Sequence, residues 1–263
     1  MVDVSERSVT NSRDGAVGII TLNRPETFNC ISPDVLDGID AARTEFEADA
    51  TIKVILIKAA GKNFCTGADL GFVTAAREGR GEKLAEFVAY GHQVFRRLEL
   101  SPLPVIAAIQ GLCLAGGIEL MLSCDIAFAA QSAKLGDQHG RYGLVPGWGG
   151  TQRLGRTLGA RRALELMYSA RWLEAAEAER WGLVNKVVLD AELESAALEY
   201  CTRLASRNRD ATAAMKRLTR EGLDLSLEAG LDFERREVVV ALMGENTSEG
   251  LSAFAERREP KFQ

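Results

Sequence analysis

Hydrophobic residues recur along the chain in two alternating patterns. Short, nearly continuous apolar runs, each ended by turn residues, stand at 16–22, 53–59, 104–110, 125–130 and 183–189. Runs of this kind predict strands with both faces buried, as in parallel sheets. Other segments repeat their apolar residues every three or four positions, which predicts helices at 32–49, 81–100, 151–169 and 174–181. This alternation of strands and helices predicts an α/β fold.

The chain changes character beyond about residue 192. No strand-like run follows, and the segments have the periodicity of successive helices, among them ATAAMKRLTREGLD and SEGLSAFAERRE. We therefore divide the chain into a core at 1–192 and a helical C-terminal region at 193–263. The segment RREVVVALM at 235–243 has apolar residues on more than one helical face, so we expect it to be buried against another subunit.

Composition and charge exclude several classes of protein. With 46% apolar residues, 26% charged residues and a formal net charge of −5, the 263-residue chain lacks the basic surface expected for binding nucleic acid or an anionic membrane. The first residues show no apolar signal region and no run is long enough to span a membrane, so we expect neither feature. Five cysteines without a CxxC pair indicate reduced thiols and a cytoplasmic location.

Motifs for common bound groups do not occur in the sequence. No cluster of His, Cys, Asp or Glu has the spacing of metal ligands. No glycine-rich phosphate-binding motif follows a strand. We therefore expect no metal and no nicotinamide cofactor.

The segment KNFCTGADL at 62–70 is the first candidate for chemistry. After a predicted strand, the chain turns through Thr66 and Gly67 into Ala68 and Asp69. Small residues at such a turn let a ligand approach backbone N–H groups closely. An ordinary strand-to-helix turn would have the same composition, so the segment alone leaves both interpretations open.

The segment QGLCLAGGIELMLSCD at 110–125 is the second candidate. Gly116 and Gly117 begin a predicted helix, where unpaired N–H groups and the positive end of the helix dipole can hold an oxyanion. Glu119 follows amid apolar neighbours, where desolvation favours a raised pKa and acid–base work. The alternative is a first-turn glutamate that only complements the helix dipole.

The segment LGDQHGRYGLVPGWGG at 135–150 is the third candidate. It holds His139, one of only two histidines in the chain, within a turn-rich loop. Histidine exchanges protons near neutral pH, although a loop histidine can simply be exposed or hydrogen-bonded. Asp137 is two residues away and could orient the ring, but we expect it to be a solvated loop aspartate.

Taken in order, the segments NRPETFNCI, FCTGADL, PVIAAIQGLCLAGGIEL, CDIAFAA and LVPGWGGTQRL make a more specific pattern. Through them the chain resembles the enoyl-CoA hydratase/isomerase (crotonase) superfamily over nearly its full length. The resemblance implies a spiral of ββα units with a helical C-terminal region that forms a homotrimer, often paired into a hexamer. It also implies an acyl-CoA thioester substrate, with coenzyme A as part of the substrate and no prosthetic group.

The resemblance assigns roles to individual residues. It implies that the backbone N–H groups of Ala68 and Gly116 hold the thioester oxygen. Phe254 and Lys261 would reach coenzyme A from the same or a neighbouring subunit, and Trp148 would either narrow the acyl pocket or pack. The positions implied to bind coenzyme A or substrate are Arg24, Asn29, Thr66, Gly67, Asp69, Leu70, Gly117, Trp148, Phe254 and Lys261.

The implied catalytic pair departs from the pattern of the superfamily. Hydratases of this superfamily use two glutamates on one water; Glu119 matches the first, and His139 stands where the second is expected. The missing glutamate puts a simple isomerase role in doubt. We predict a hydratase-type lyase in which Glu119 and His139 form an acid–base pair. The alternatives are a hydrolase that cleaves a C–C bond of a β-diketone or CoA-linked ring, and a non-catalytic acyl-CoA-binding protein.

Overall fold

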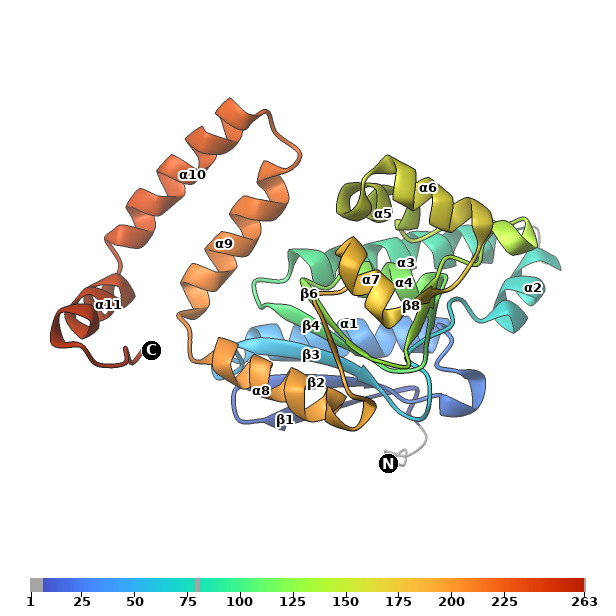
Figure 1. Ribbon diagram of the computed structural model, residues 1–263, viewed down its shortest axis with the longest axis horizontal. Helices are drawn as coiled ribbons and strands as arrows, with labels where there is room; N and C mark the ends of the chain where they lie inside the picture. The colour runs from blue at the N-terminus through green and yellow to red at the C-terminus, as the bar shows by residue number, and fades with distance from the viewer. Residues whose placement is uncertain (1–6, 79–80, 263) are drawn as a thin grey trace.

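The computed structural model describes residues 7–78 and 81–262, and its centre is a six-stranded sheet (Figure 1). The strand order is β1-β2-β3-β4-β6-β9, with β1 antiparallel to β2 and the other neighbours parallel. The bounds are β1 (Val9–Asp14), β2 (Val17–Leu22), β3 (Val54–Ala59), β4 (Val105–Ile109), β6 (Ile126–Ala130) and β9 (Lys186–Val188). The five strands predicted from apolar runs all form, and β2, β3 and β4 are almost wholly buried.

A smaller sheet lies beside the main one. Its order is β5-β7-β8, with β5 (Leu112–Leu114) parallel to β7 (Lys134–Gly136) and β7 antiparallel to β8 (Leu173–Glu174). The sequence analysis missed these three strands and β1. The small-sheet strands are two or three residues long, and β1 is largely exposed, so neither leaves an extended apolar run.

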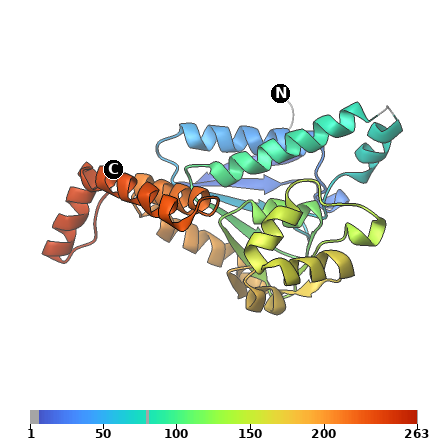
Figure 2. The ribbon, with the colours of Figure 1, turned by 90° about the horizontal axis from the view of Figure 1, so that it is seen from above.

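Helices cover both faces of the main sheet (Figure 2). Helix α1 packs against α3, β1 and β2, whereas α8 packs against β2, β3, β4 and β6 on the other face. The helices of the core are α1 (Pro33–Ala48), α2 (Leu70–Glu78), α3 (Glu82–Leu100), α4 (Gly116–Leu122), α5 (Gly150–Leu158), α6 (Ala160–Ser169), α7 (Ala175–Trp181) and α8 (Leu193–Ala205), with short 3-10 turns η2 (Pro25–Thr27), η3 (Gly140–Tyr142) and η4 (Asp190–Glu192). The predicted helix at 151–169 is two helices, because the chain turns at Gly159, whose φ is +75°.

After residue 193 the described chain contains helices and no strands, and the first of these helices packs on the main sheet. Helix α8 lies on the sheet, so the projecting arm begins only at α9. The arm consists of α9 (Arg209–Gly222), α10 (Leu227–Leu242) and α11 (Glu245–Glu256), and it extends away from the core in both views (Figures 1 and 2). Helix α10 buries none of its residues in the single chain.

No helix of the described residues is long and apolar enough to cross a membrane.

Candidate active site

Two backbone turns lie directly against each other at the start of α4. Two isolated parallel β-bridges, which pair the backbone of Cys65 with Cys113 and that of Ile31 with Ala68, hold the turn at 65–68 beside β5; both cysteines are free thiols. The contact leaves no room for side chains: a Cβ added to Gly67 would lie 3.0 Å from the nitrogen of Gly116, and Gly67 has φ +106°. Glycine is therefore required here by both space and conformation.

Both turns present an unused N–H group. In the β-bridge at Ile31, the N–H of Ile31 donates to the carbonyl of Gly67, and its carbonyl accepts from the N–H of Asp69. The N–H of Ala68, between these two residues, takes no part. Gly116 is the first residue of α4, where a helix has no internal acceptor for its N–H. Within residues 7–78 and 81–262, neither of these N–H groups donates a hydrogen bond. Two such donors on adjoining turns can stabilise a developing oxyanion.

Backbone strain accompanies this arrangement. Ala115, the residue before α4, adopts φ +50° and ψ −118°, which side-chain-bearing residues rarely adopt. Holding one such residue costs about 1–3 kcal/mol, and the surrounding structure must impose it. Here the hydrogen bond from Ala115 N to the carbonyl of Gly136, at 2.9 Å, ties the strained residue to β7.

Glu119 lies one turn into α4 and is almost completely buried, with 1% of its surface exposed. Its Oε1 accepts hydrogen bonds from the backbone nitrogens of Trp148, at 2.7 Å, and Gly150, at 2.8 Å. Its Oε2 receives no hydrogen bond from the described residues. Burial raises the pKa of the carboxyl, and the two N–H groups and the charge of His139 offset only part of that effect. Glu119 is thus anchored by one oxygen, with a raised affinity for a proton.

His139 stands just before η3 and is paired with Asp137. Its Nδ1 lies 3.0 Å from Oδ1 and 3.1 Å from Oδ2 of Asp137, and its backbone nitrogen donates to Oδ1 at 3.1 Å. The expectation that Asp137 is solvated is wrong, since its surface is 0% exposed. A carboxylate at Nδ1 fixes the tautomer with its proton there and leaves Nε2 as the reactive nitrogen.

The structure brings Glu119 and His139 within electrostatic reach of each other. Burial lowers the pKa of His139, but the hydrogen bond and charge of Asp137, with a smaller effect of Glu119, outweigh it, so the net pKa is raised. In turn, the charge of His139 lowers the pKa of Glu119. The two side chains can therefore act as a coupled acid–base pair.

The loop at 24–30 lies beside the 65–70 turn. Arg24 Nη1 donates to Asp69 Oδ2 and to the carbonyl of Cys30, both at 3.1 Å. Burial raises the pKa of Asp69, but the backbone N–H of Phe72 and the Arg24 guanidinium outweigh it and lower the pKa. Asp69 is therefore an ionised residue that joins this loop to the start of α2.

Asn29 has a different role from the implied ligand contact. It is 1% exposed, and its amide is fully occupied: Oδ1 accepts from Arg24 N at 2.8 Å, and Nδ2 donates to the carbonyls of Ala60 at 2.9 Å and Asn63 at 2.7 Å. Its side chain connects the loop to the segment that follows β3 by hydrogen bonds, and no donor of the amide is left for a ligand.

The remaining implied binding positions are divided between the site and the arm. Thr66 is half-buried and Leu70 is 62% exposed beside the turn, whereas Gly117 is buried so tightly that an added Cβ would lie 2.2 Å from the carbonyl oxygen of Cys65. Phe254 is 85% exposed on α11, and Lys261 is exposed just beyond it. The arm and the η3 loop lie at opposite ends of the molecule's longest axis (Figure 1), so Phe254 and Lys261 do not reach the site within one chain.

Trp148 is a core residue, 3% exposed, with its ring edge-on to Phe87 and Phe95 at centroid distances of 5.2 and 5.5 Å. The ring also lies against the turn of α4, because a Cβ added to Gly116 would be 2.8 Å from its Cζ3. Its Nε1 has no hydrogen-bond partner and faces Gly91 of α3. The side chain therefore packs, and it does so directly next to the free N–H of Gly116.

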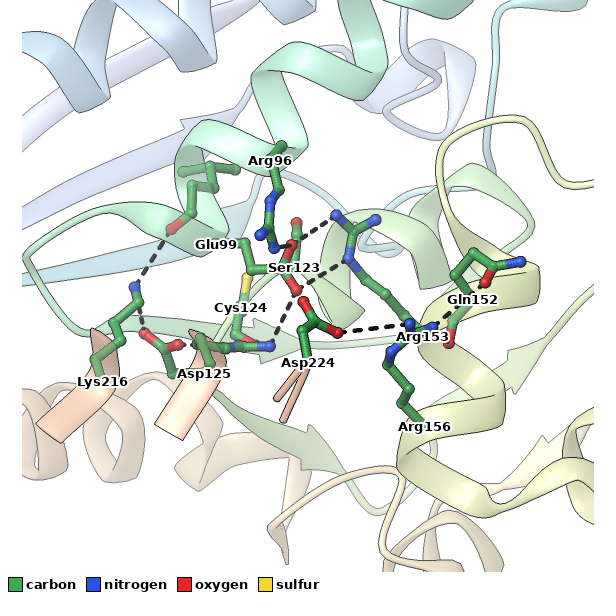
Figure 3. A network of polar contacts seen from close by, with 12 residues as sticks. Arg96, Glu99, Ser123, Cys124, Asp125, Gln152, Arg153, Arg156, Lys216 and Asp224 are labelled. Atoms are coloured by element: carbon green, nitrogen blue, oxygen red, sulfur yellow. Dashed lines mark hydrogen bonds and ion pairs between the residues drawn. The ribbon is translucent and has the colours of Figure 1, made fainter. Parts of the chain in front are cut away.

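Two charged residues that the sequence analysis did not single out lie behind the site. Arg153 of α5 donates from Nη1 to the carbonyl of Trp148 at 2.8 Å. Its Nη2 donates to Glu99 of α3 at 2.8 Å, and Glu99 is only 7% exposed (Figure 3). A glutamate on the apolar face of α3, four residues after the buried Phe95, was the available signal.

Comparisons with known proteins identify the family of the chain. Residues 12–263 match the enoyl-CoA hydratase/isomerase family. The chain is 38% identical over 251 residues to a probable enoyl-CoA hydratase of Mycobacterium bovis, with 95% of each chain covered. It is 36% identical to a short-chain-enoyl-CoA hydratase of Clostridium acetobutylicum, with 96% of each covered. The crystal structure of an enoyl-CoA hydratase from Polaromonas superposes with a TM-score of 0.94 at 30% identity, covering 97% of this chain and 99% of that one.

The chain therefore belongs to the enoyl-CoA hydratase/isomerase family, and its fold is the α/β crotonase fold with a helical C-terminal region. The resemblance inferred from the motif order is confirmed over almost the whole chain.

The close contact of Trp148 with Gly91 provides a test of the packing. A Cβ on Gly91 would lie 2.2 Å from Trp148 Nε1, so we expect Gly91→Ala to lower the free energy of unfolding by about 1–3 kcal/mol, as overpacking does. Gly155→Ala is the matched control, because nothing lies within 4 Å of the added Cβ on this helical glycine. Denaturant unfolding of both variants checks the expectation, and equal midpoints would contradict it.

Proposed function

We propose that this protein adds water across the Cα–Cβ double bond of a 2-enoyl-CoA thioester, with Glu119 and His139 as its acid–base pair. The observation that carries the proposal is the buried Glu119, anchored by one oxygen, within electrostatic reach of a His139 that Asp137 orients. The two free N–H groups of Ala68 and Gly116, on the adjoining turns, provide a place for the thioester oxygen. The names of the hydratases to which the chain is similar support the same chemistry.

The proposed reaction needs one base, one acid and one oxyanion site. Ionised Glu119 takes a proton from water through Oε2 as the water oxygen bonds to Cβ, and the electron pair of the double bond moves toward the thioester. The N–H groups of Ala68 and Gly116 stabilise the resulting enolate oxygen. Protonated His139 then gives its Nε2 proton to Cα, and transfer of the proton from Glu119 to His139 restores the starting state. Because these groups suffice, we propose no prosthetic group and no metal.

We propose that the arm forms an interface between copies of the chain. No residue of helix α10 is fully buried in the single chain, and its apolar residues Val238, Val239, Val240 and Leu242 are 44–72% exposed. An exposed apolar surface of this kind marks a site of association. We propose a homotrimer, single or paired into a hexamer, in which Phe254 and Lys261 of one subunit lie near coenzyme A bound by another.

A β-diketone hydrolase is the second candidate, and the Asp137–His139 pair favours it. A histidine oriented by a buried carboxylate is an arrangement for a general base that activates water. In that reaction His139 would direct water to a ketone carbon, a C–C bond would break, and the oxyanion site would hold the enolate that leaves. Glu119 has no necessary part in that scheme, which is why hydration is the better-supported function.

The two catalytic assignments are tested by product analysis of wild type, Glu119→Gln and His139→Ala. We expect wild type to convert a 2-enoyl-CoA to the 3-hydroxyacyl-CoA, and each variant to lose about 10²- to 10⁴-fold in kcat, the usual contribution of a general acid or base. Thr151→Ala, an exposed position on α5, is the control and should retain full activity. Full hydration by both catalytic variants would refute the assignments; chain cleavage would favour the hydrolase, and binding without turnover a non-catalytic role.

The pH dependence of hydration follows from the two shifted groups. The base form of Glu119 is lost as pH falls through its pKa, which lies above the ordinary 4.5. The acid limb of the profile should therefore lie at a higher pH than for an ordinary glutamate. The acid form of His139 is lost as pH rises through its pKa, which lies above the ordinary 6.5. We expect a bell-shaped kcat profile. Asp137→Asn should move the alkaline limb to lower pH, and an unmoved limb would contradict the role of the His139–Asp137 pair.

Trp148 supports a preference for short acyl chains. Its ring lies against the turn that holds the Gly116 N–H and joins Phe87 and Phe72 in an aromatic wall, with the two phenylalanine centroids 4.8 Å apart. We propose that a thioester whose carbonyl oxygen is held at Gly116 directs its acyl chain, from the carbonyl carbon, toward this wall. The short-chain-enoyl-CoA hydratase among the similar proteins is in keeping with that limit.

The preference is tested by changing the size of the ring. Trp148→Leu should raise kcat/KM for an eight-carbon relative to a four-carbon 2-enoyl-CoA by at least about tenfold, since each methylene in a fitted pocket is worth 10-fold or more. Trp148→Phe keeps most of the bulk and should leave the ratio nearly unchanged. An unchanged ratio in the leucine variant would place the acyl chain elsewhere.

A further inference from the structure

The backbone of Trp148 is held on both sides by charged residues. Its N–H donates to Glu119 Oε1 at 2.7 Å, and its carbonyl accepts from Arg153 Nη1 at 2.8 Å. Gly150, the second donor to Glu119, begins α5, three residues before Arg153. The position of both N–H groups that anchor Glu119 therefore depends on how this one turn is held.

Arg153 holds the turn with a guanidinium that is itself fixed. Its Nη2 and Nε donate to Glu99 at 2.8 and 3.3 Å, while Nη1 remains for the carbonyl of Trp148. The side chains of Arg153 and Glu99 are 13% and 8% exposed. A planar guanidinium with two sides occupied has little freedom to move, and a lysine could not make the same set of contacts.

Glu99 also joins the site to the arm. Arg220 of α9 donates to Glu99 Oε1 at 3.1 Å, and to Asp125 and the carbonyl of Cys124 at 3.0 and 3.1 Å. Figure 3 shows Arg96 and Arg153 next to Glu99, with Asp125 farther away, beside Lys216. Burial raises the pKa of Glu99, but hydrogen bonds from Arg153 and Arg96 outweigh it and hold the pKa below its usual value. Glu99 is thus a charged centre shared by α3, α5 and α9.

Stability alone is a weak reason for such a cluster. Taking a carboxylate and its guanidinium partners out of water costs several kcal/mol per ion, and apolar residues of similar size often stabilise a core as well or better. The cluster does, however, impose one geometry on the residues it contacts, and one of those contacts is the carbonyl of Trp148.

We propose that Glu99 and Arg153 are positioning residues for Glu119, acting through the backbone of Trp148. Neither residue contacts the proposed reacting atoms. Ionised Glu99 orients the Arg153 guanidinium, the guanidinium fixes the carbonyl of Trp148, and the N–H groups of Trp148 and Gly150 then fix the carboxylate of Glu119. Through Arg220 the same chain of contacts reaches α9, so the seating of the arm on the core bears on the geometry of the site. This inference rests on the proposed role of Glu119 as the base.

The test compares Arg153→Lys and Glu99→Gln with Arg96→Gln in the full-length protein. Arg153→Lys keeps the charge but loses the planar guanidinium; Glu99→Gln keeps the size but loses the charge. Arg96 also pairs with Glu99, at 2.8 Å, but its side chain is 48% exposed and donates its hydrogen bond to Glu99 rather than to the turn at Trp148, so it is the matched control. Hydration kinetics, melting temperature and hydrogen exchange resolved at single amides are measured for each.

We expect both test variants to lose about 10- to 100-fold in kcat, the scale expected when a catalytic group is misplaced by an ångström or less, with KM little changed. The amides of Trp148 and Gly150 should exchange at least about tenfold faster, because the hydrogen bonds that protect them open more often. Arg96→Gln should change neither quantity.

The inference is overturned if either test variant remains folded with wild-type kcat and wild-type exchange at those two amides, or if Arg96→Gln has the same effects. It is equally overturned if kcat falls only in proportion to a lowered melting temperature, since that is a general loss of structure. The exchange measurement needs no turnover. If wild type does not hydrate any enoyl-CoA, the proposed function fails, while the exchange result still decides whether Glu99 and Arg153 hold the turn.

Discussion

The hydrogen bonds from Trp148 N and Gly150 N to Glu119 connect the two halves of the site. They join a carboxylate at the start of α4 to the turn before α5, about thirty residues later in the chain. Each bond links a buried carboxylate to a backbone N–H, and such charge-assisted bonds are stronger and shorter than neutral ones. Because Glu119 is buried, losing them would leave a desolvated charge without partners, which is among the most costly defects a core can have. These two hydrogen bonds form only if the start of α4 and the turn before α5 are held close together.

Close backbone packing is what allows that arrangement. Gly67 and Gly116 let two turns come into contact, and Gly117 lets α4 begin directly over the carbonyl of Cys65. Ala115 adopts a strained conformation to make the same turn. Any side chain at the glycines would separate the turns and with them the two free N–H groups. The positions of the two free N–H groups are thus set by contacts between backbone segments.

The proposed acid–base pair, Glu119 and His139, differs from two glutamates in more than residue type. A histidine with its Nδ1 against the buried Asp137 keeps a proton to a higher pH than a free histidine, while Glu119 keeps a proton to a higher pH than a free carboxyl. The two groups interact, so their protonation states are linked and belong to the pair. Through Arg153, Glu99 and Arg220, a continuous set of hydrogen bonds connects the turn at Trp148 to α9, the first helix of the arm.

The sequence by itself determined the local features: the five apolar strands, the glycine turns, the order of the motifs and hence the family. These depend on short-range periodicity and on residues whose backbone preferences are strong, so they can be seen without contacts. Only the tertiary structure decided the features that depend on distant partners. Asp137 proved to be buried, the amide of Asn29 proved to be occupied by backbone partners, α8 proved to belong to the core, and Trp148 proved to pack beside Gly116. In each case the side chain or helix could equally well face water in an isolated segment, and long-range packing is what removes that choice.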